Sequence, residues 1–145
     1  MDRAYPETFF TLEEANALLP QLELILERMQ RTSIKVREEM TALTQEQGEH
    51  ALAHLSVPQL LRLQPALRPL FEELAQAVQA IEQYGCLFKG LDLGLVDFPA
   101  KLDDEIVELC WQYGEKEIAF YHRQDEGFAG RRPLKPQNNK PRYYQ

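Results

Sequence analysis

The sequence predicts an α+β protein: a long antiparallel helical hairpin followed by a small antiparallel β-sheet of about three strands. Up to residue 84, apolar residues recur mostly every three or four positions, which is the period of an amphipathic helix. After Gly85 the pattern changes to short runs in which apolar and polar residues alternate, as in a half-buried strand. With 145 residues, 44% hydrophobic and 27% charged, the chain has the size and composition of one globular domain. We therefore expect a single domain over residues 1–134, helical over about 9–85 and β-rich over about 86–134.

The first long helix begins with a capping box. Thr11 and Glu14 fit the S/T-x-x-E pattern, in which each side chain accepts a hydrogen bond from a free backbone N–H at the helix start. Pro20 lacks an N–H and clashes with the preceding turn, so it predicts a kink or the start of a new helix. Beyond it runs one apolar stripe: Leu22, Ile25, Leu26, Met29, Val36, Met40 and Leu43.

The second long helix extends from Pro65 or Pro69 to Tyr84. Gly85 follows at the position where a left-handed residue commonly ends a helix. The polar residues 44–56 are expected to form a partly helical connection. The second stripe consists of Leu67, Leu70, Phe71, Leu74, Val78, Ile81 and Tyr84. Two such stripes do not fully cover each other. Either the small sheet covers one side or a second copy of the chain does, in a four-helix bundle; we favour the second, a homodimer through the helices.

The strongest strand candidates are residues 93–100 and 105–112, joined by a hairpin turn at 101–104. Residues 86–89 and 118–122 are shorter candidates, and residues 127–134 are expected to be loop. Within 105–112, alternation places Val107, Leu109 and Trp111 on one face of the sheet. It places Ile106, Glu108, Cys110 and Gln112 on the other.

Charge and cysteine content describe a cytoplasmic protein with a basic tail. No apolar run approaches the ~20 residues that cross a bilayer, so no membrane association is expected, and the first residues show no apolar signal region. Two cysteines are few for a secreted disulfide scaffold.

From Arg131 on there are five basic residues and no acidic one, so residues 1–130 hold 11 basic and 23 acidic residues, a net charge of −12. The acidic body disfavours nucleic-acid binding. Only the basic segment from Arg131 to the end, expected to be disordered over 135–145, offers a weak nucleic-acid contact, through Arg132, Lys135, Lys140 and Arg142.

Several segments together resemble a known family. FTLEEAN (residues 10–16), GLVDFPA (94–100), LCW (109–111), GE (114–115), His122 and RRPL (131–134) are similar to the prokaryotic family catalogued as domain of unknown function 2203. The resemblance covers about residues 9–134. It implies a small bacterial or archaeal cytoplasmic protein with no established activity, and it carries over no catalytic residue. Tyr121 stands where members often have tryptophan before the motif histidine.

The residues whose side chains are suited to metal binding or catalysis lie in the β-rich half. Carboxylate, thiol and imidazole groups are metal-ligand types. Three residues that carry them, Asp97, Cys110 and His122, come from different predicted strands or strand ends. For a divalent metal ion the sequence favours His122 with Asp97, Glu115 or Glu126, and Cys110 less. The alternative is structural: Cys110 in the core, Glu115 paired with Arg131, and His122 satisfied by a hydrogen bond. The candidate set is Asp97, Cys110, Glu115, His122, Asp125, Glu126 and Arg131.

No established catalytic motif is present. There is no G-x-S-x-G elbow and no glycine-rich phosphate loop. His50 and His54 have helical i,i+4 spacing, but a solvated connector is the better interpretation. The sequence therefore favours a non-enzymatic homo-oligomeric interaction or scaffold protein. The alternatives are a metal-binding protein or metal-dependent enzyme with its site around His122, and weak nucleic-acid association through the tail.

Overall fold

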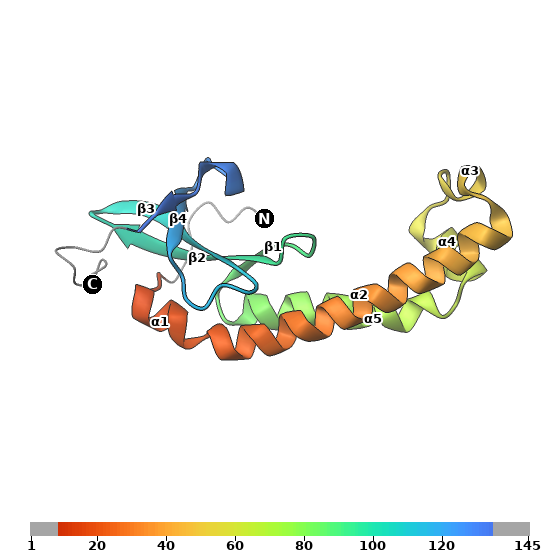
Figure 1. Cartoon of the computed structure of the whole chain (residues 1–145), viewed down its shortest axis with the longest axis horizontal. Helices are drawn as coiled ribbons and strands as arrows, with labels where there is room; N and C mark the ends of the chain where they lie inside the picture. Colours follow the sequence, from red (N-terminus) through yellow and green to blue (C-terminus); the bar gives the residue numbers. More distant parts are fainter. Residues whose placement is uncertain (1–8, 135–145) are drawn as a thin grey trace. The chain divides into compact units, whose positions relative to one another are not determined.

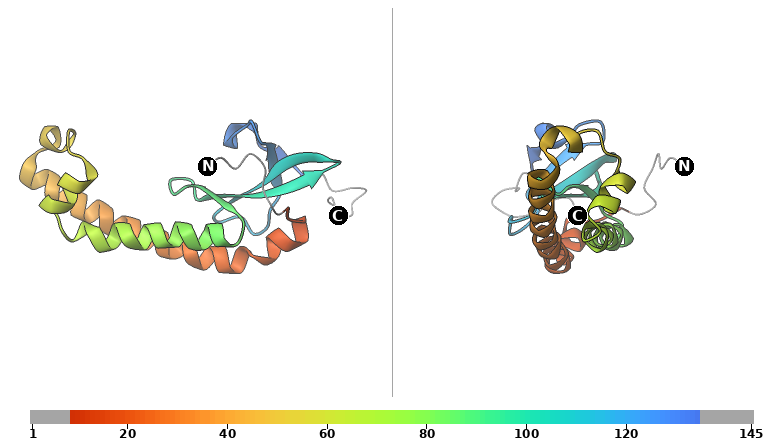
Figure 2. Two further views of the ribbon diagram at one scale, coloured as in Figure 1. Left: turned by 180° about the vertical axis from the view of Figure 1, so that it is seen from behind. Right: turned by 90° about the vertical axis from the view of Figure 1, so that its right-hand side faces the viewer.

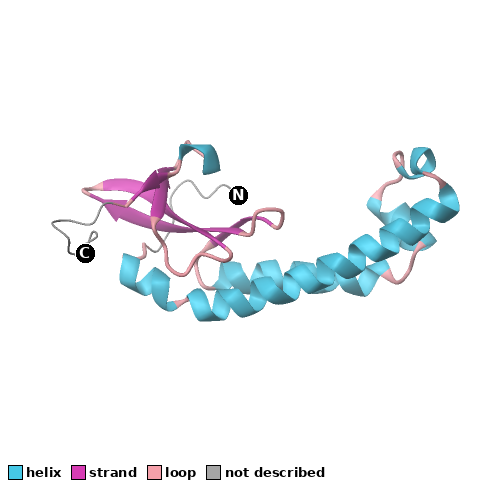
Figure 3. Cartoon of the chain, viewed as in Figure 1, coloured by secondary structure: helices cyan, strands magenta, loops and turns pink. Residues whose placement is uncertain are grey.

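The α+β prediction is confirmed by the computed structural model, which describes residues 9–134. Within this range there are five α-helices and one five-stranded antiparallel sheet in the order β1-β2-β3-β4-β5 (Figures 1 and 3). The helices are α1 (Leu12–Ala17), α2 (Leu19–Gln47), α3 (Glu49–Leu52), α4 (Val57–Leu63) and α5 (Leu67–Gln83). The strands are β1 (Leu87–Gly90), β2 (Leu95–Leu102), β3 (Glu105–Gln112), β4 (Phe120–Arg123) and β5 (Arg132–Pro133), with a short 3-10 helix, η1 (Phe128–Gly130).

The chain divides into two compact units, which are described separately. The first comprises the residues up to Leu24 together with those from Ile81 onward, and it contains α1 and the sheet. The second comprises residues 25–80 and contains most of the two long helices with the short helices between them. The boundaries between the units therefore fall within α2 and α5.

The helix starts follow the local sequence signals. The Thr11 N–H donates to Glu14 Oε1 at 2.9 Å, and the Glu14 N–H donates to Thr11 Oγ1 at 3.0 Å, so the predicted capping box is formed. Leu18 separates α1 from α2, and Pro20 lies in the first turn of α2, where its missing N–H costs least. The proline thus starts a new helix.

In the second unit the connection between the long helices is partly helical, as predicted. α2 extends to Gln47, and α3 and α4 follow before α5. Ser56 caps α4 with a second capping box, to Gln59. α5 ends just before Gly85, whose φ of +98° is a conformation that favours glycine.

The prediction of about three strands is wrong, because the sheet has five. β3 has the predicted bounds, whereas β2 begins and ends two residues later than expected. The missed strand is β5, which lies in the segment expected to be loop and pairs only Arg132 with Tyr121 and Pro133 with Phe120. A strand of two residues is too short to show an alternating pattern. Proline is tolerated in it because an edge strand can leave one backbone N–H position without a hydrogen bond. The disordered tail predicted over residues 135–145 lies outside the described residues.

The two faces of the sheet differ in chemistry. Residues directly opposite each other on neighbouring strands share a face, so the face that carries Phe98 also carries Leu109; we call it the core face. Phe10, just before α1, packs edge-on against Phe98 with ring centroids 5.4 Å apart. Asn16 of α1 accepts the Ile118 N–H at 2.8 Å. α1 lies on one side of the sheet and η1 on the other (Figures 1 and 2).

The β2–β3 turn generates a stability prediction. Asp103 and Asp104 form the two-residue connection with φ of 50° and 69°, the positive values that a type I′ turn requires and that cost a non-glycine residue free energy. We expect Asp104→Gly to raise the free energy of unfolding by about 0.5–1 kcal/mol, because relief of this strain exceeds the added entropy of glycine in the unfolded chain. Asp104→Ala should lower it. Urea denaturation measures both, and equal effects of the two substitutions would contradict the assignment.

Candidate functional site

Three buried side chains from neighbouring strands meet on the face opposite the core face, which we call the site face. Asp97 of β2 lies directly opposite Cys110 of β3, and His122 of β4 is two residues from the partner of Cys110. One ligand atom from each residue lies within 4.8 Å of the others. Their relative exposures are 2%, 1% and 4%. In residues 9–134 this is the one group of three or more His, Cys, Asp or Glu side chains close enough to hold a metal ion.

The contacts of His122 place a proton on ring nitrogen Nδ1. Nδ1 lies 2.8 Å from the carbonyl oxygen of Arg123, which only accepts, so Nδ1 donates. Nε2 lies 2.9 Å from Asp97 Oδ2. In the neutral ring, Nε2 then presents a lone pair to a carboxylate oxygen. That contact is favourable only when a proton is shared between the two atoms or a cation binds both.

This geometry disfavours a cysteine–histidine nucleophilic pair. Such a pair needs one ring nitrogen to accept the thiol proton while the other is oriented by a third group. Here both nitrogens of His122 are engaged, by Arg123 and Asp97. Burial, and then the negative charge of Asp97, raise the pKa of the Cys110 thiol to about 11. Without a cation, Cys110 is therefore a thiol at neutral pH.

Glu108 also lies on the site face, although the sequence pattern does not mark it as a candidate ligand. It lies opposite His122 in the β3–β4 pairing and is only 7% exposed. Burial first, and then the charge of Asp97, raise its pKa to about 7, while Lys89 and His122 oppose the shift. The strand alternation already placed Glu108 on the face of Cys110. Nothing in that pattern distinguished a buried carboxylate from a solvated one.

Two carboxylate oxygens on the site face lack hydrogen-bond partners. Asp97 Oδ1 and Glu108 Oε1 are both buried, and no described residue donates to them. An unpaired buried polar atom costs about 1–3 kcal/mol, and more when it is charged. These orphaned oxygens are an observation in favour of a bound cation or donor.

Glu115 and Arg131 are held apart from the metal-type cluster by their own interaction. The Arg131 guanidinium donates to both oxygens of Glu115, at 2.8 and 3.0 Å, and to the carbonyl oxygen of Cys110 at 3.3 Å. The guanidinium carbon, Cζ, of Arg131 lies 4.2 Å from the centroid of the Phe120 ring and 4.9 Å from that of the Phe128 ring. Arg131 thus ties β3 and the turn that follows it to η1.

Glu126 lines the site but has its own partners. Its carboxylate accepts the Arg123 N–H at 3.0 Å and lies 2.7 Å from the Arg132 guanidinium. The Arg123 N–H and the Arg132 charge lower the pKa of Glu126. Arg132, one of the residues considered for nucleic-acid contact, is therefore in an ion pair. The other three, Lys135, Lys140 and Arg142, lie outside the described residues.

The cluster opens into a cavity of about 280 Å³. Asp97, Cys110 and His122 form part of its lining together with Glu126. Lys89 of β1 and Phe128 of η1 also line it. The cavity therefore joins the buried cluster to a positively charged side chain and an aromatic ring.

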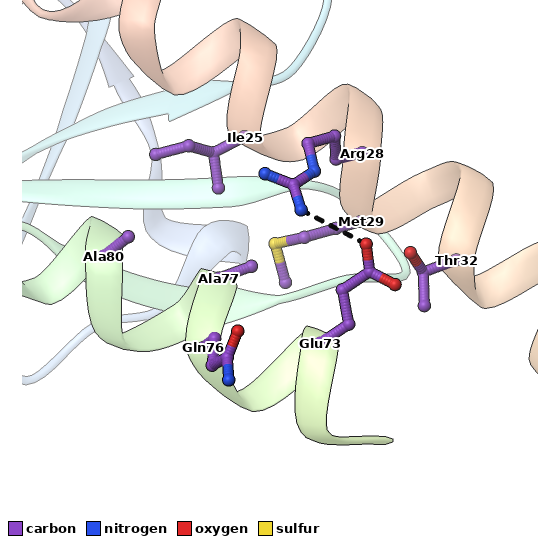
Figure 4. Close-up of a pocket in the computed structure, with 8 residues that line it drawn as sticks. All are labelled: Ile25, Arg28, Met29, Thr32, Glu73, Gln76, Ala77 and Ala80. Carbon is purple, nitrogen blue, oxygen red and sulfur yellow. Dashed lines mark hydrogen bonds and ion pairs between the residues drawn. The ribbon is translucent and has the colours of Figure 1, made fainter. Parts of the chain in front are cut away.

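A second, smaller hollow of about 100 Å³ lies between α2 and α5 (Figure 4). Arg28 and Glu73 form a bond of 3.2 Å across it, and Met29 and Ala77 contribute apolar surface. It contains no cluster of metal-ligand side chains. Among the described residues, the site face is the better candidate for chemistry.

The chain belongs to the family described as an uncharacterized conserved protein (DUF2203), whose match covers residues 8–134. This confirms the resemblance found in the sequence. No curated protein and no solved structure matches the chain. Within the described residues, the helices are too short or too polar to span a membrane.

The raised pKa of Glu108 generates a pH prediction for the metal-free protein. Because the folded-state value of about 7 lies above the ordinary 4.5, the folded chain retains a proton that the unfolded chain loses between these pH values. The contribution of Glu108 to stability should therefore fall as pH rises from about 4.5 to 7, by at most about 1.4 kcal/mol per pH unit.

Glu108→Gln should remove this dependence, so its stability relative to the unmodified protein should increase with pH over that range. Urea denaturation in the presence of a chelator, repeated from acidic to neutral pH, measures the difference. Glu117→Gln, the same change at an exposed turn position, is the matched control. A pH-independent difference for Glu108→Gln would contradict the prediction.

Proposed function

We propose that this member of the DUF2203 family is a metal-binding protein that holds one divalent transition-metal ion through Asp97, Cys110 and His122. The observation that carries the proposal is the meeting of three buried ligand atoms within 4.8 Å, from three adjacent strands. Each residue is positioned by the rigid ladder of the sheet rather than by a loop, as a preorganised site requires.

The surroundings of His122 support this proposal. Metal-bound histidines generally donate their second ring N–H to a carbonyl or carboxylate, which fixes the tautomer and directs the other nitrogen to the ion. The Nδ1 contact with the Arg123 carbonyl has this form and leaves Nε2 facing Asp97. A metal ion bound to Nε2 and Oδ2 would take the place of the shared proton and also give Asp97 Oδ1 a nearby positive charge.

The ligand types favour zinc over calcium or magnesium. A thiolate, an imidazole and a carboxylate suit Zn²⁺ or a similar transition metal, whereas Ca²⁺ and Mg²⁺ prefer oxygen ligands. Ligand atoms around tetrahedral zinc lie about 3.3–3.6 Å apart, so small side-chain rotations suffice from the separations present. Binding displaces the proton of the Cys110 thiol, since a coordinating thiol is deprotonated.

Elemental analysis of untagged protein, after incubation with zinc and dialysis, tests the proposal. We expect about one zinc ion per chain and a higher melting temperature, because a ligand that binds only the folded state stabilises it. His122→Ala and Asp97→Asn should lose the ion. His54→Ala, at an exposed histidine, and Cys86→Ala, at the other buried cysteine, should retain it.

Folded protein that keeps no zinc above the level of the His122→Ala variant would overturn the proposal. Circular dichroism of every variant separates loss of the ion from loss of the fold.

We also propose the homodimer that the sequence predicts. On α5 the apolar residues Leu70, Phe71, Leu74 and Val78 remain partly exposed in the single chain. A second copy that packs against this row would remove it from water, at roughly 25 cal/mol per Å² of apolar surface.

Sedimentation at micromolar concentration should show a dimer, and Leu74→Glu should shift it to monomer. Gln79→Glu places the same charge at an exposed position of α5 and should leave the dimer intact. A monomeric parent protein would rule out this assembly.

A further inference from the structure

A β-bulge in β1 directs Lys89 into the cavity of the site face. Phe88 lies opposite Val96 and Gly90 opposite Leu95, so Lys89 is an extra residue in β1 at this point. Bulges of this kind change the direction of a side chain and are common beside functional sites. Gly90 adopts a φ of +140°, which a residue with a side chain rarely adopts. Glycine at position 90 thus permits the irregular backbone that follows Lys89.

The charge of Lys89 is available for a ligand. Lys89 lines the cavity, and its charge acts on Glu108 across the same face. It forms no ion pair with any described residue. Lys89 is exposed, whereas Glu108 is buried. An incoming anion therefore meets the ammonium group at the mouth of the cavity.

With a metal ion in place, the remaining charges favour an anion. The Asp97 carboxylate and the Cys110 thiolate together balance the two positive charges of the ion. Glu126, which also lines the cavity, is paired with Arg132 at 2.7 Å. Glu108, on which the charge of Lys89 acts, is buried and does not line the cavity. Lys89 is then a cation in the cavity lining with which no described carboxylate forms an ion pair.

The metal ion also has room for another ligand. Three protein ligands leave a fourth position of tetrahedral zinc open, which distinguishes zinc sites that accept a substrate from closed structural ones. The adjoining cavity of about 280 Å³ is close to the lower limit for small-molecule pockets. Leu95 and Phe128 provide apolar walls.

We infer that the site binds a small oxyanion, a carboxylate or phosphate group, with one oxygen on the metal ion and another on the ammonium group of Lys89. This inference rests on the proposed metal site. It assigns to that site a class of ligand and a second binding residue outside the metal cluster.

The test uses the full chain loaded with Co²⁺ in place of zinc, because the visible bands of Co²⁺ report directly on its ligands. Acetate and inorganic phosphate are titrated separately, with chloride at matched ionic strength as the control anion. We expect saturable changes of the cobalt bands at millimolar concentration for acetate or phosphate and none for chloride. The comparison of acetate with phosphate identifies which oxyanion the site prefers.

The matched variants are Lys89→Gln and Lys116→Gln, the latter at an exposed turn position. A charge-assisted hydrogen bond is worth about 1.5–3 kcal/mol, so Lys89→Gln should weaken the binding of the anion about tenfold or more. It should leave the cobalt content unchanged. Lys116→Gln should alter neither.

Cobalt bands that respond to neither oxyanion, or an anion affinity that Lys89→Gln leaves unchanged, would overturn this inference while the metal site stands. Absence of cobalt bands from folded protein would overturn both.

Discussion

The pairing register of β2 with β3 is the constraint on which the site depends. Side chains alternate between the two faces of a strand, so a slip by one residue exchanges the faces completely. In the observed register Asp97 lies opposite Cys110, while Phe98 lies opposite Leu109 on the core face. A slipped strand would place a carboxylate among the aromatic residues of the core. The two-residue turn at Asp103 and Asp104, with both residues at positive φ, fixes this register at one end of the hairpin.

The same register concentrates a free-energy cost on the site face. Asp97, Glu108 and His122 are all buried, and two of their carboxylate oxygens lack partners among the described residues. Burial of such groups without compensation is unfavourable by several kcal/mol in total. On the core face the packing of Phe98 against Phe10 and of Leu109 within the sheet provides apolar burial that offsets the cost. A stable sheet is thus what permits a polar cluster to be preorganised on its other face.

Alternation in the sequence was sufficient to predict β3 with its correct bounds and to assign its residues to two faces. It was not sufficient to predict β5, because two residues show no period and one of them is a proline. It also did not reveal the bulge at Lys89, since an extra residue is defined by the partner strand and not by its own sequence. Residue type alone put Glu115 and Glu126 among the candidate metal ligands. Their ion pairs with Arg131 and Arg132 arise from tertiary contacts that no local pattern contains.

Glu108 shows that tertiary structure determines which carboxylates of a strand are buried. Glu105 and Glu108 are both glutamates of β3, yet Glu105 is half exposed and paired with Arg123, at 2.9 Å, while Glu108 is buried. The difference comes from position in the sheet, because Glu105 lies at the hairpin end and Glu108 lies between β2 and β4. Desolvation, rather than residue type, then raises the pKa of Glu108 to about 7. The site face is therefore defined by which polar residues the sheet deprives of water, and that property appears only once the neighbouring strands are in place.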